Sequence, residues 1–440
     1  MFLRRSVFAC LIGMVSFSAV AKDLVYEGVN YGKVSGGLMG VYVITGEENN
    51  YDPNQGAAYM ATLKYNSPSF SGFSFGLGEY LVGDLLGLSE FTPTPGSGDR
   101  LARGLFINND GSSQGHLGEI FVQYKSGMFG VKAGRQMLDT PLTKASYSTM
   151  PNFYGAAVAD IKPSEDLSFK IGQVTEMSFG ARSMTEFGLV GERTPTAGAA
   201  INPASIGQAE FHPIRAVVPG ASAQDTNGIT LVNATYKGFK NVTLSAWDFY
   251  ADDIANNIYL EGDWVIPSEA WKGKFKLSAQ FLNQSDEGDS LAGKLDYSMF
   301  GLKASFGTKK WSVYAAANKS EGDTWFLNAF GGDPAFTSSI FSRNAYRENV
   351  DAYKVGVSFS PMKGVKLMAN YANYGQSDSL GFGGLAAAKD AEEFDLVAVY
   401  KPNKDWMFKT FYANRTSEYD GVGGAERTQG HWRAIVTYKF

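Results

Sequence analysis

The sequence predicts an all-β protein, a transmembrane antiparallel β-barrel of about 18 strands, on three observations. Segments of about ten residues alternate between apolar and polar side chains, as strands with one lipid face and one watery face require. Tight turns and longer loops alternate between these segments. Glycine and aromatic residues are abundant, with 51 Gly, 31 Phe, 23 Tyr and 7 Trp. Beyond residue 21, no apolar run reaches the roughly 20 residues of a membrane helix, which excludes a polytopic helical protein.

The segment 430–440 shows the alternation most clearly. Trp432, Val436 and Tyr438 share one parity with the final residue, Phe440, while the other parity is mostly polar. A soluble sandwich would show the same alternation, but it rarely stops on an aromatic residue. A terminal amphipathic strand that ends in Phe resembles the last strand of bacterial outer-membrane barrels. By that resemblance, Phe440 is expected to be the assembly signal that the barrel-assembly machinery reads.

Residues 1–21 have the pattern of a secretory signal peptide. Arg4 and Arg5 precede an apolar run that is too short to cross a bilayer comfortably, and small residues suited to cleavage follow it. We therefore expect residues 1–21 to be cleaved and the barrel to span 22–440. Cys10, the only cysteine, would be lost with the signal peptide, so the mature chain has no disulfide. Its stability is expected to come from a closed, hydrogen-bonded barrel.

The alternating segments define the expected strands and two classes of connection between them. The strands are 36–45, 57–66, 73–82, 117–125, 130–137, 154–162, 167–176, 228–237, 241–251, 257–266, 274–284, 295–306, 310–318, 350–360, 365–375, 392–400, 406–415 and 430–440. Counted back from the carboxy terminus, odd connections are long and even ones are tight turns, except for a short loop at 252–256. This arrangement is typical of outer-membrane barrels, with short turns in the periplasm and long loops outside. A barrel of about 16 strands is the alternative count.

Aromatic residues gather at the short-turn ends of the expected strands, for example Phe73, Trp311 and Tyr400. Rings of this kind prefer the interface between lipid headgroups and hydrocarbon, so the pattern indicates one aromatic girdle. A core of a soluble β-protein explains the apolar face but not the position of the rings at one rim.

The polar parity of the strands is expected to line the lumen, and it is basic. The expected lumen and selectivity residues are Lys132, Arg135, Lys170, Lys276, Lys303, Lys366, Lys409, Arg415 and Arg433. Fewer acids share that face, namely Glu119, Glu261, Asp263 and Asp395. Charges in a confined channel focus the potential and concentrate counter-ions, so small anions should be attracted. A single lysine near a strand end, such as Lys64, is better explained by snorkelling to the rim, and it is the collective basic bias that indicates a basic lumen.

The segment 130–155 carries a resemblance to a known family. It reads Gly-Val-Lys-Ala-Gly-Arg-Gln at 130–136, Asp-Thr-Pro-Leu at 139–142 and Met-Pro-Asn-Phe-Tyr-Gly at 150–155. This combination resembles the OprD-type specific porins of Gram-negative bacteria. The resemblance implies an eighteen-stranded barrel in the outer membrane. Such barrels pass small molecules, often carboxylates or basic amino acids, through a narrowed lumen with a row of basic residues.

Two long loops are candidates for narrowing the lumen. In the loop 138–153, Pro141 fixes φ and cannot donate to a ladder, so the chain should leave the strand sharply and could turn inward. The constriction residues expected there are Asp139, Lys144 and Tyr147. An ordinary outer loop is the alternative. The loop 177–227 carries charges of both signs, and a loop of that length is usually functional or disordered.

The sequence offers little support for an enzyme. His116, His212 and His431 lack a metal-binding spacing, and no serine lies in a nucleophile elbow. The formal net charge of −5 and the lack of a basic block argue against a nucleic-acid partner. We therefore expect no catalytic residue, no metal and no cofactor.

The expected function is passive, charge-biased diffusion of small hydrophilic solutes, chiefly anions or carboxylate-bearing molecules. One alternative is a general diffusion porin that works as a trimer of barrels with about 16 strands each. Another is a surface adhesin whose loops bind a host or matrix while the barrel only anchors it. The surroundings are expected to be outer-membrane lipid and lipopolysaccharide, and the chain to be a monomer or a trimer.

Overall fold

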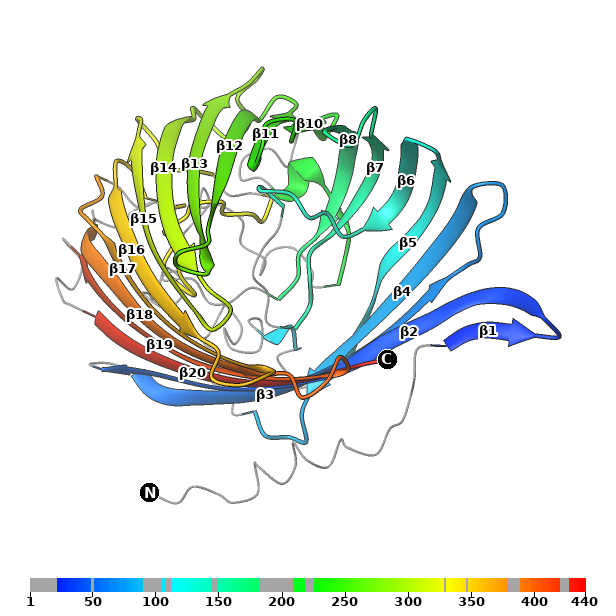
Figure 1. Cartoon of the computed structure of the whole chain (residues 1–440), viewed down its shortest axis with the longest axis horizontal. Coiled ribbons are helices and arrows are strands. Elements are labelled where there is room, and N and C mark those ends of the chain that lie inside the picture. Colours follow the sequence, from blue (N-terminus) through cyan, green and yellow to red (C-terminus); the bar gives the residue numbers. More distant parts are fainter. Residues whose placement is uncertain are drawn as a thin grey trace.

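The computed structural model describes residues 22–48, 51–89, 105–107, 112–143, 149–181, 209–217, 225–327, 330–345, 347–378, 388–419 and 427–440. Its strands form one antiparallel sheet that closes on itself, because β2 (Val29–Glu48) pairs with β20 (Arg427–Lys439). Figure 1 looks into the resulting ring. The wall is a closed barrel of 18 strands, which confirms the predicted fold and its strand count over the alternative of sixteen.

Every predicted strand overlaps one strand of the wall. Between β2 and β20 these are β3 (Tyr51–Asn66), β4 (Phe73–Asp84), β5 (Gln114–Ser126), β6 (Phe129–Gln136), β7 (Phe153–Ile161), β8 (Leu167–Ser178), β10 (Ile229–Tyr236), β11 (Val242–Ala251), β12 (Ala255–Ser268), β13 (Gly273–Asp286), β14 (Asp296–Gly307), β15 (Trp311–Glu321), β16 (Asp351–Phe359), β17 (Val365–Tyr374), β18 (Ala388–Tyr400) and β19 (Trp406–Tyr419). Consecutive wall strands pair with each other, and β8 pairs directly with β10.

Three short elements were not predicted. β1 (Lys22–Tyr26) forms a hairpin with the start of β2, and its consecutive apolar residues Leu24, Val25 and Tyr26 show no alternation. β9 (His212–Pro213) and the 3-10 helix η2 (Ile214–Val217) are too short to show a periodic pattern. η2, green in Figure 1, lies within the ring of strands.

The outer face of the barrel is apolar and the inner face carries the polar side chains. In β16, Tyr353 and Val355 are 58% and 51% exposed, whereas the intervening Lys354 is only 8% exposed. A soluble protein would reverse this order, so the pattern is that of strands which face lipid outside and a lumen inside. Among the residues that the structure describes, no helix is long and apolar enough to cross a membrane.

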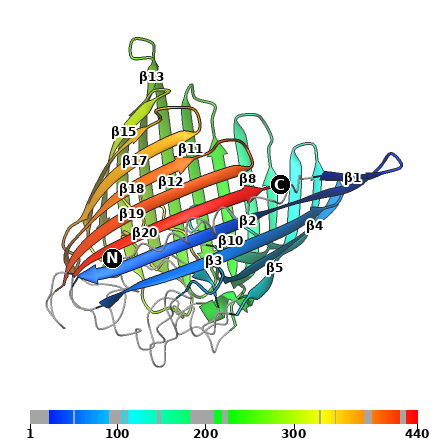
Figure 2. The same ribbon diagram turned by 90° about the horizontal axis from the view of Figure 1, so that it is seen from below.

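The two rims differ as predicted. Figure 2 shows compact turns at one rim. The long connections, such as that between β15 and β16, leave from the opposite ends of the strands. Aromatic pairs cluster at the turn rim, with ring centroids 4.7 Å apart for Phe73 and Tyr124 and 4.6 Å apart for Phe275 and Phe306. These pairs lie where the sequence predicted the girdle, at the level expected for one membrane interface.

The barrel closes at the carboxy terminus. The amide of Gly36 donates to the carbonyl of Phe440 at 2.9 Å, and the amide of Phe440 donates back at 3.0 Å. A Cβ at position 36 would lie 2.3 Å from the backbone carbonyl oxygen of Thr62 and 2.7 Å from Cζ of the Phe440 ring, so this close approach at the seam requires glycine. Phe440 therefore belongs to the closing strand pair, and its role as an assembly signal stays a prediction.

Candidate functional site in the lumen

The connection between β15 and β16, residues 322–350, lies against the inner wall of the barrel. Its described residues exclude 328, 329 and 346. Polar side chains of successive strands bond its backbone. The amide of Phe336 donates to Oε1 of Gln280 at 2.8 Å, and the amide of Thr337 donates to Oδ1 of Asn318 at 3.0 Å. The hydroxyl of Tyr374 donates to the carbonyl of Thr337 at 2.7 Å. We call residues 322–350 the lumen loop.

Two charged side chains continue these contacts on β16 and β18. The Lys354 ammonium donates to the carbonyl of Ser338 at 2.7 Å. The two oxygens of Glu393 accept the amides of Phe341 and Ser342, at 2.9 Å and 2.6 Å. Glu393 is 1% exposed, so the loop covers its carboxylate completely. Because β13, β15, β16, β17 and β18 all bond its backbone, the loop takes a defined path along the wall.

An apolar contact fixes the first half of the lumen loop. Phe326, Leu327 and Phe330 are buried in one cluster with Tyr154, Tyr297 and other inward residues of the wall. The Tyr297 and Phe326 rings lie 5.6 Å apart, and the Tyr154 hydroxyl donates to the Phe330 carbonyl at 2.6 Å. An apolar patch of the wall therefore lies beneath the first half of the loop.

Two other loop segments contact the same region. The amide of Gly332 in the lumen loop donates to the carbonyl of Leu142 at 2.8 Å, so the described start of the loop 138–153 adjoins it. Phe211, just before β9, packs against His116 with ring centroids 5.3 Å apart. Its ring also lies 4.1 Å from the Arg135 guanidinium. Residues 209–217 thus line the wall beside β5, β6 and β8.

The pairing register places charged inner residues in one row across the wall from β12 to β19. Neighbours in this row are Arg415, Glu393, Ala372, Lys354, Ala316, Lys303, Ser278 and Asp263. We call it the ionic row. It runs across the strands, and the strands of such barrels tilt about 35–45°, so the row climbs along the lumen. Small residues flank Lys354 in the row and leave its long side chain room.

Some of the predicted lumen cations are neutralised by carboxylates. The pairs are Lys64 with Glu119 at 2.6 Å, Arg135 with Glu176 at 3.2 Å, Lys276 with Asp263 at 2.9 Å, and Lys170 with Asp160. The sequence placed these cations on the inner face but did not reveal the pairing. Their field on a passing ion is therefore weaker than the basic residues alone would suggest.

Other predicted cations contact aromatic rings instead. The ammonium of Lys132 lies 3.7 Å from the centroid of Phe121, and that of Lys303 lies 4.6 Å from the centroid of Tyr314. Lys409 lies 5.3 Å from the centroid of Phe411. In the part of the chain described, none of these three lysines forms an ion pair with a carboxylate. A ring orients a cation without cancelling its charge.

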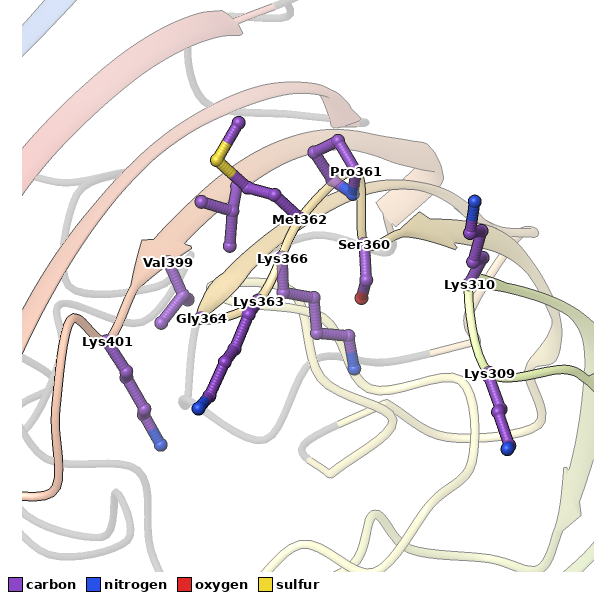
Figure 3. Close-up of a pocket in the computed structure, with 11 residues that line it drawn as sticks. Lys309, Lys310, Ser360, Pro361, Met362, Lys363, Gly364, Lys366, Val399 and Lys401 are labelled. Carbon is purple, nitrogen blue, oxygen red and sulfur yellow. The ribbon is translucent and has the colours of Figure 1, made fainter.

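The remaining predicted cations lie at two places. Arg415 and Arg433 are 3% and 4% exposed, on the inner faces of β19 and β20. Nη2 of Arg415 donates to Oε1 of Gln429 at 2.5 Å. Lys366 lies at the turn rim, beside further lysines of neighbouring turns (Figure 3).

The structure describes only part of the predicted constriction. Asp139 is exposed, and the hydroxyls of Thr140 and Thr143 lie 2.7 Å apart in the turn that follows it. Lys144 and Tyr147 lie outside the described residues, as does most of the loop 177–227.

Sequence reasoning treated the lumen loop only as a long connection. It also did not single out Glu393, Gln280, Asn318 or Tyr374, the side chains that bond the loop. One signal was available, because 325–341 contains Trp325, Phe326, Leu327, Phe330, Phe336 and Phe341, an apolar content that a solvated loop does not need.

No group of three or more His, Cys, Asp or Glu residues suited to a metal ion occurs in the described ranges.

A closed barrel with an apolar outer band, a polar inner wall and a loop inside its lumen defines an outer-membrane channel. The sequence model for "outer membrane porin, OprD family" matches residues 71–440, so the chain belongs to the OprD family of outer-membrane porins. It lies in the outer membrane of a Gram-negative bacterium. The family and fold are those of channels rather than enzymes. A search of curated protein sequences finds no match.

Solved structures support the fold. Pseudomonas aeruginosa OpdK with vanillate has a TM-score of 0.69 at 14% identity, covering 92% of this chain and 98% of OpdK. Acinetobacter baumannii OccAB4 has a TM-score of 0.71 at 12% identity, covering 93% and 98%. Pseudomonas aeruginosa OccK2 (OpdF) in complex with glucuronate has a TM-score of 0.66 at 13% identity, covering 92% and 98%.

Proposed function

We propose that this porin gives passive, charge-biased diffusion to small hydrophilic anions, chiefly carboxylates. The observation that carries the proposal is the set of inward cations that form no ion pair with a carboxylate among the described residues. Lys303 and Lys409 lie beside aromatic rings, whereas several other inner cations form ion pairs. In a narrow lumen between low-dielectric walls, such charges raise the local concentration of anions.

The solved relatives agree with a carboxylate solute. OpdK was solved with vanillate and OccK2 with glucuronate, and both ligands carry a carboxylate. At such low sequence identity these structures support only the shared fold. The proposed solute therefore rests on the charges of this chain's own wall.

Selectivity by size is the second part of the proposal. Side chains on β7, β13, β15, β16, β17 and β18 bond the lumen loop. The loop occupies part of the cross-section, and we expect the loops 138–153 and 177–227 to narrow it further. Only small solutes would then pass. We retain two earlier expectations as parts of this proposal, that residues 1–21 are a cleaved signal peptide and that lipopolysaccharide surrounds the outer rim.

Reversal potentials in a salt gradient across a planar bilayer test the charge bias. The wild-type channel should prefer anions, and Lys303→Gln combined with Lys409→Gln should shift the reversal potential towards cations. The shift should shrink in molar salt, where the Debye length is about 3 Å. The matched control is Lys162→Gln with Lys240→Gln, which removes the same charge from turns outside the lumen.

An unchanged reversal potential in the Lys303/Lys409 variant at low salt would contradict the proposal, and so would an equal shift in the control. The same recording separates the alternatives. A barrel that only anchors an adhesin would not conduct, and a wide general diffusion pore would show a large conductance with little charge preference.

A further inference from the structure

A basic hollow lies at the turn rim, between three neighbouring turns of the barrel. It has a volume of about 610 Å³, a size common for small-molecule sites. Five lysines line it, Lys309 and Lys310 before β15, Lys363 and Lys366 around the start of β17, and Lys401 after β18. We call these five residues and the hollow between them the turn pocket.

The turn pocket contains no acid among its lining residues. Lumen lysines elsewhere, such as Lys64, Lys170 and Lys276, each have a carboxylate partner. Within the described ranges, none of the five pocket lysines forms an ion pair. Because like charges at close range repel, a concave group of cations without acids is stabilised when an anion enters it.

Backbone hydrogen bonds hold the three turns together. The amide of Ser360 donates to the carbonyl of Lys310 at 2.6 Å, and the amide of Lys401 donates to the carbonyl of Gly364 at 2.7 Å. Gly364 has φ +82°, and a Cβ there would lie 2.3 Å from the Lys401 carbonyl, so this contact requires glycine. The backbone therefore presents the lysines at a defined spacing.

The pocket opens towards the mouth of the channel rather than towards lipid. Lys366 has the inner parity of β17, whereas the adjacent Leu367 faces out and is 42% exposed. In Figure 3 the side chains of Lys363 and Lys401 converge, those of Lys366 and Lys309 extend to the same side, and Lys310 points the opposite way. Four ammonium groups from three turns thus face one space.

We infer that the turn pocket binds a small multivalent anion, one that carries two or more carboxylate or phosphate groups. A single carboxylate engages one or two ammonium groups, so lysines spread over three turns suit a ligand with several anionic groups. The inference rests on the proposed function in one respect, because such solutes must be able to reach the mouth of the channel at the turn rim. Lipid phosphate has the same chemistry, but the inward direction of the side chains favours a free solute.

Calorimetric titration of the purified, folded protein with citrate in low salt tests the binding. The test variant is Lys363→Gln with Lys401→Gln, and the control is Lys162→Gln with Lys240→Gln on the same rim. Gel mobility of unboiled samples verifies that each variant is folded. Wild type and control should bind citrate alike, and the pocket variant at least tenfold more weakly. Equal affinity in the pocket variant, or an equal loss in the control, would overturn the inference.

Two further measurements separate the source of the anion and the dependence on transport. In nanodiscs of neutral lipid and of phosphatidylglycerol, citrate affinity should be the same, whereas loss of citrate binding in phosphatidylglycerol would identify a lipid site and refute a solute site. The reversal potential of the wild-type channel is the second measurement. Citrate binding without anion selectivity in the wild-type channel would count against the proposed function alone, since the pocket would still bind.

Discussion

Glu393→Ala should release the second half of the lumen loop without unfolding the barrel. The wild-type carboxylate accepts the amides of Phe341 and Ser342 and is 1% exposed. Hydrogen bonds to a charged group contribute about 1.5–3 kcal/mol each, so the substitution removes about 3–6 kcal/mol from the local anchoring of the loop. It also removes the negative charge of Glu393 from beside the buried Arg415, which is its partner in the register of β18 and β19.

The strand pairs of the wall do not depend on this carboxylate, so the loss should be local. Taking the lower figure, about 3 kcal/mol corresponds to a fall in protection on the order of 10²-fold, at about 1.36 kcal/mol for each factor of ten. Hydrogen exchange of the Phe341 and Ser342 amides measures this directly. Single-channel records should show larger or more frequently fluctuating conductance, because part of the lumen loop can leave the wall.

Glu392→Ala is the matched control. Glu392 precedes Glu393 in β18 but has the opposite parity, and its carboxylate accepts the Tyr371 hydroxyl at 2.6 Å. Glu393→Gln should be intermediate, because its amide oxygen can still accept one backbone amide while its NH₂ group faces the other. Unchanged exchange at Phe341 and Ser342 in Glu393→Ala, or an equal increase in Glu392→Ala, would refute this account of the loop.

Two other outcomes follow from the closed wall. The folded protein should migrate differently on gels before and after boiling, because every wall strand is paired and resists detergent; identical migration would argue against a closed barrel. Deleting Phe440, which pairs with Gly36 at the seam, should lower the folded amount in the outer membrane. Conductance of the surviving channels should stay the same, and normal membrane levels after the deletion would contradict a role in assembly.

The sequence by itself determined the class of fold and the approximate position of every wall strand. The reason is that alternation between two faces is a local property, visible in any single segment. For example, the predicted strand 350–360 corresponds to Asp351–Phe359 in the structure. Turn residues such as Pro361 and Gly364 mark the strand ends just as locally. β1 was missed because Leu24, Val25 and Tyr26 do not alternate.

The sequence also identified the cations of the inner face, since parity within a strand decides which way they point. It could not tell which of them keep a free charge. The ion pair between Lys276 and Asp263 depends on the register between β12 and β13 in addition to the side-chain direction within each strand. Register is a relation between strands that alternation alone leaves open, because a shift of two residues keeps every side chain on its face.

Only the tertiary structure decided what lies in the lumen. The lumen loop has no periodic pattern, and its path is set by side chains far away in the chain, from Gln280 on β13 to Glu393 on β18. Closure of the barrel brings these strands around one space, where buried amides of the loop must find acceptors. Local alternation therefore sets the positions of the strands. The arrangement inside the lumen depends on which distant residues the closed barrel brings together.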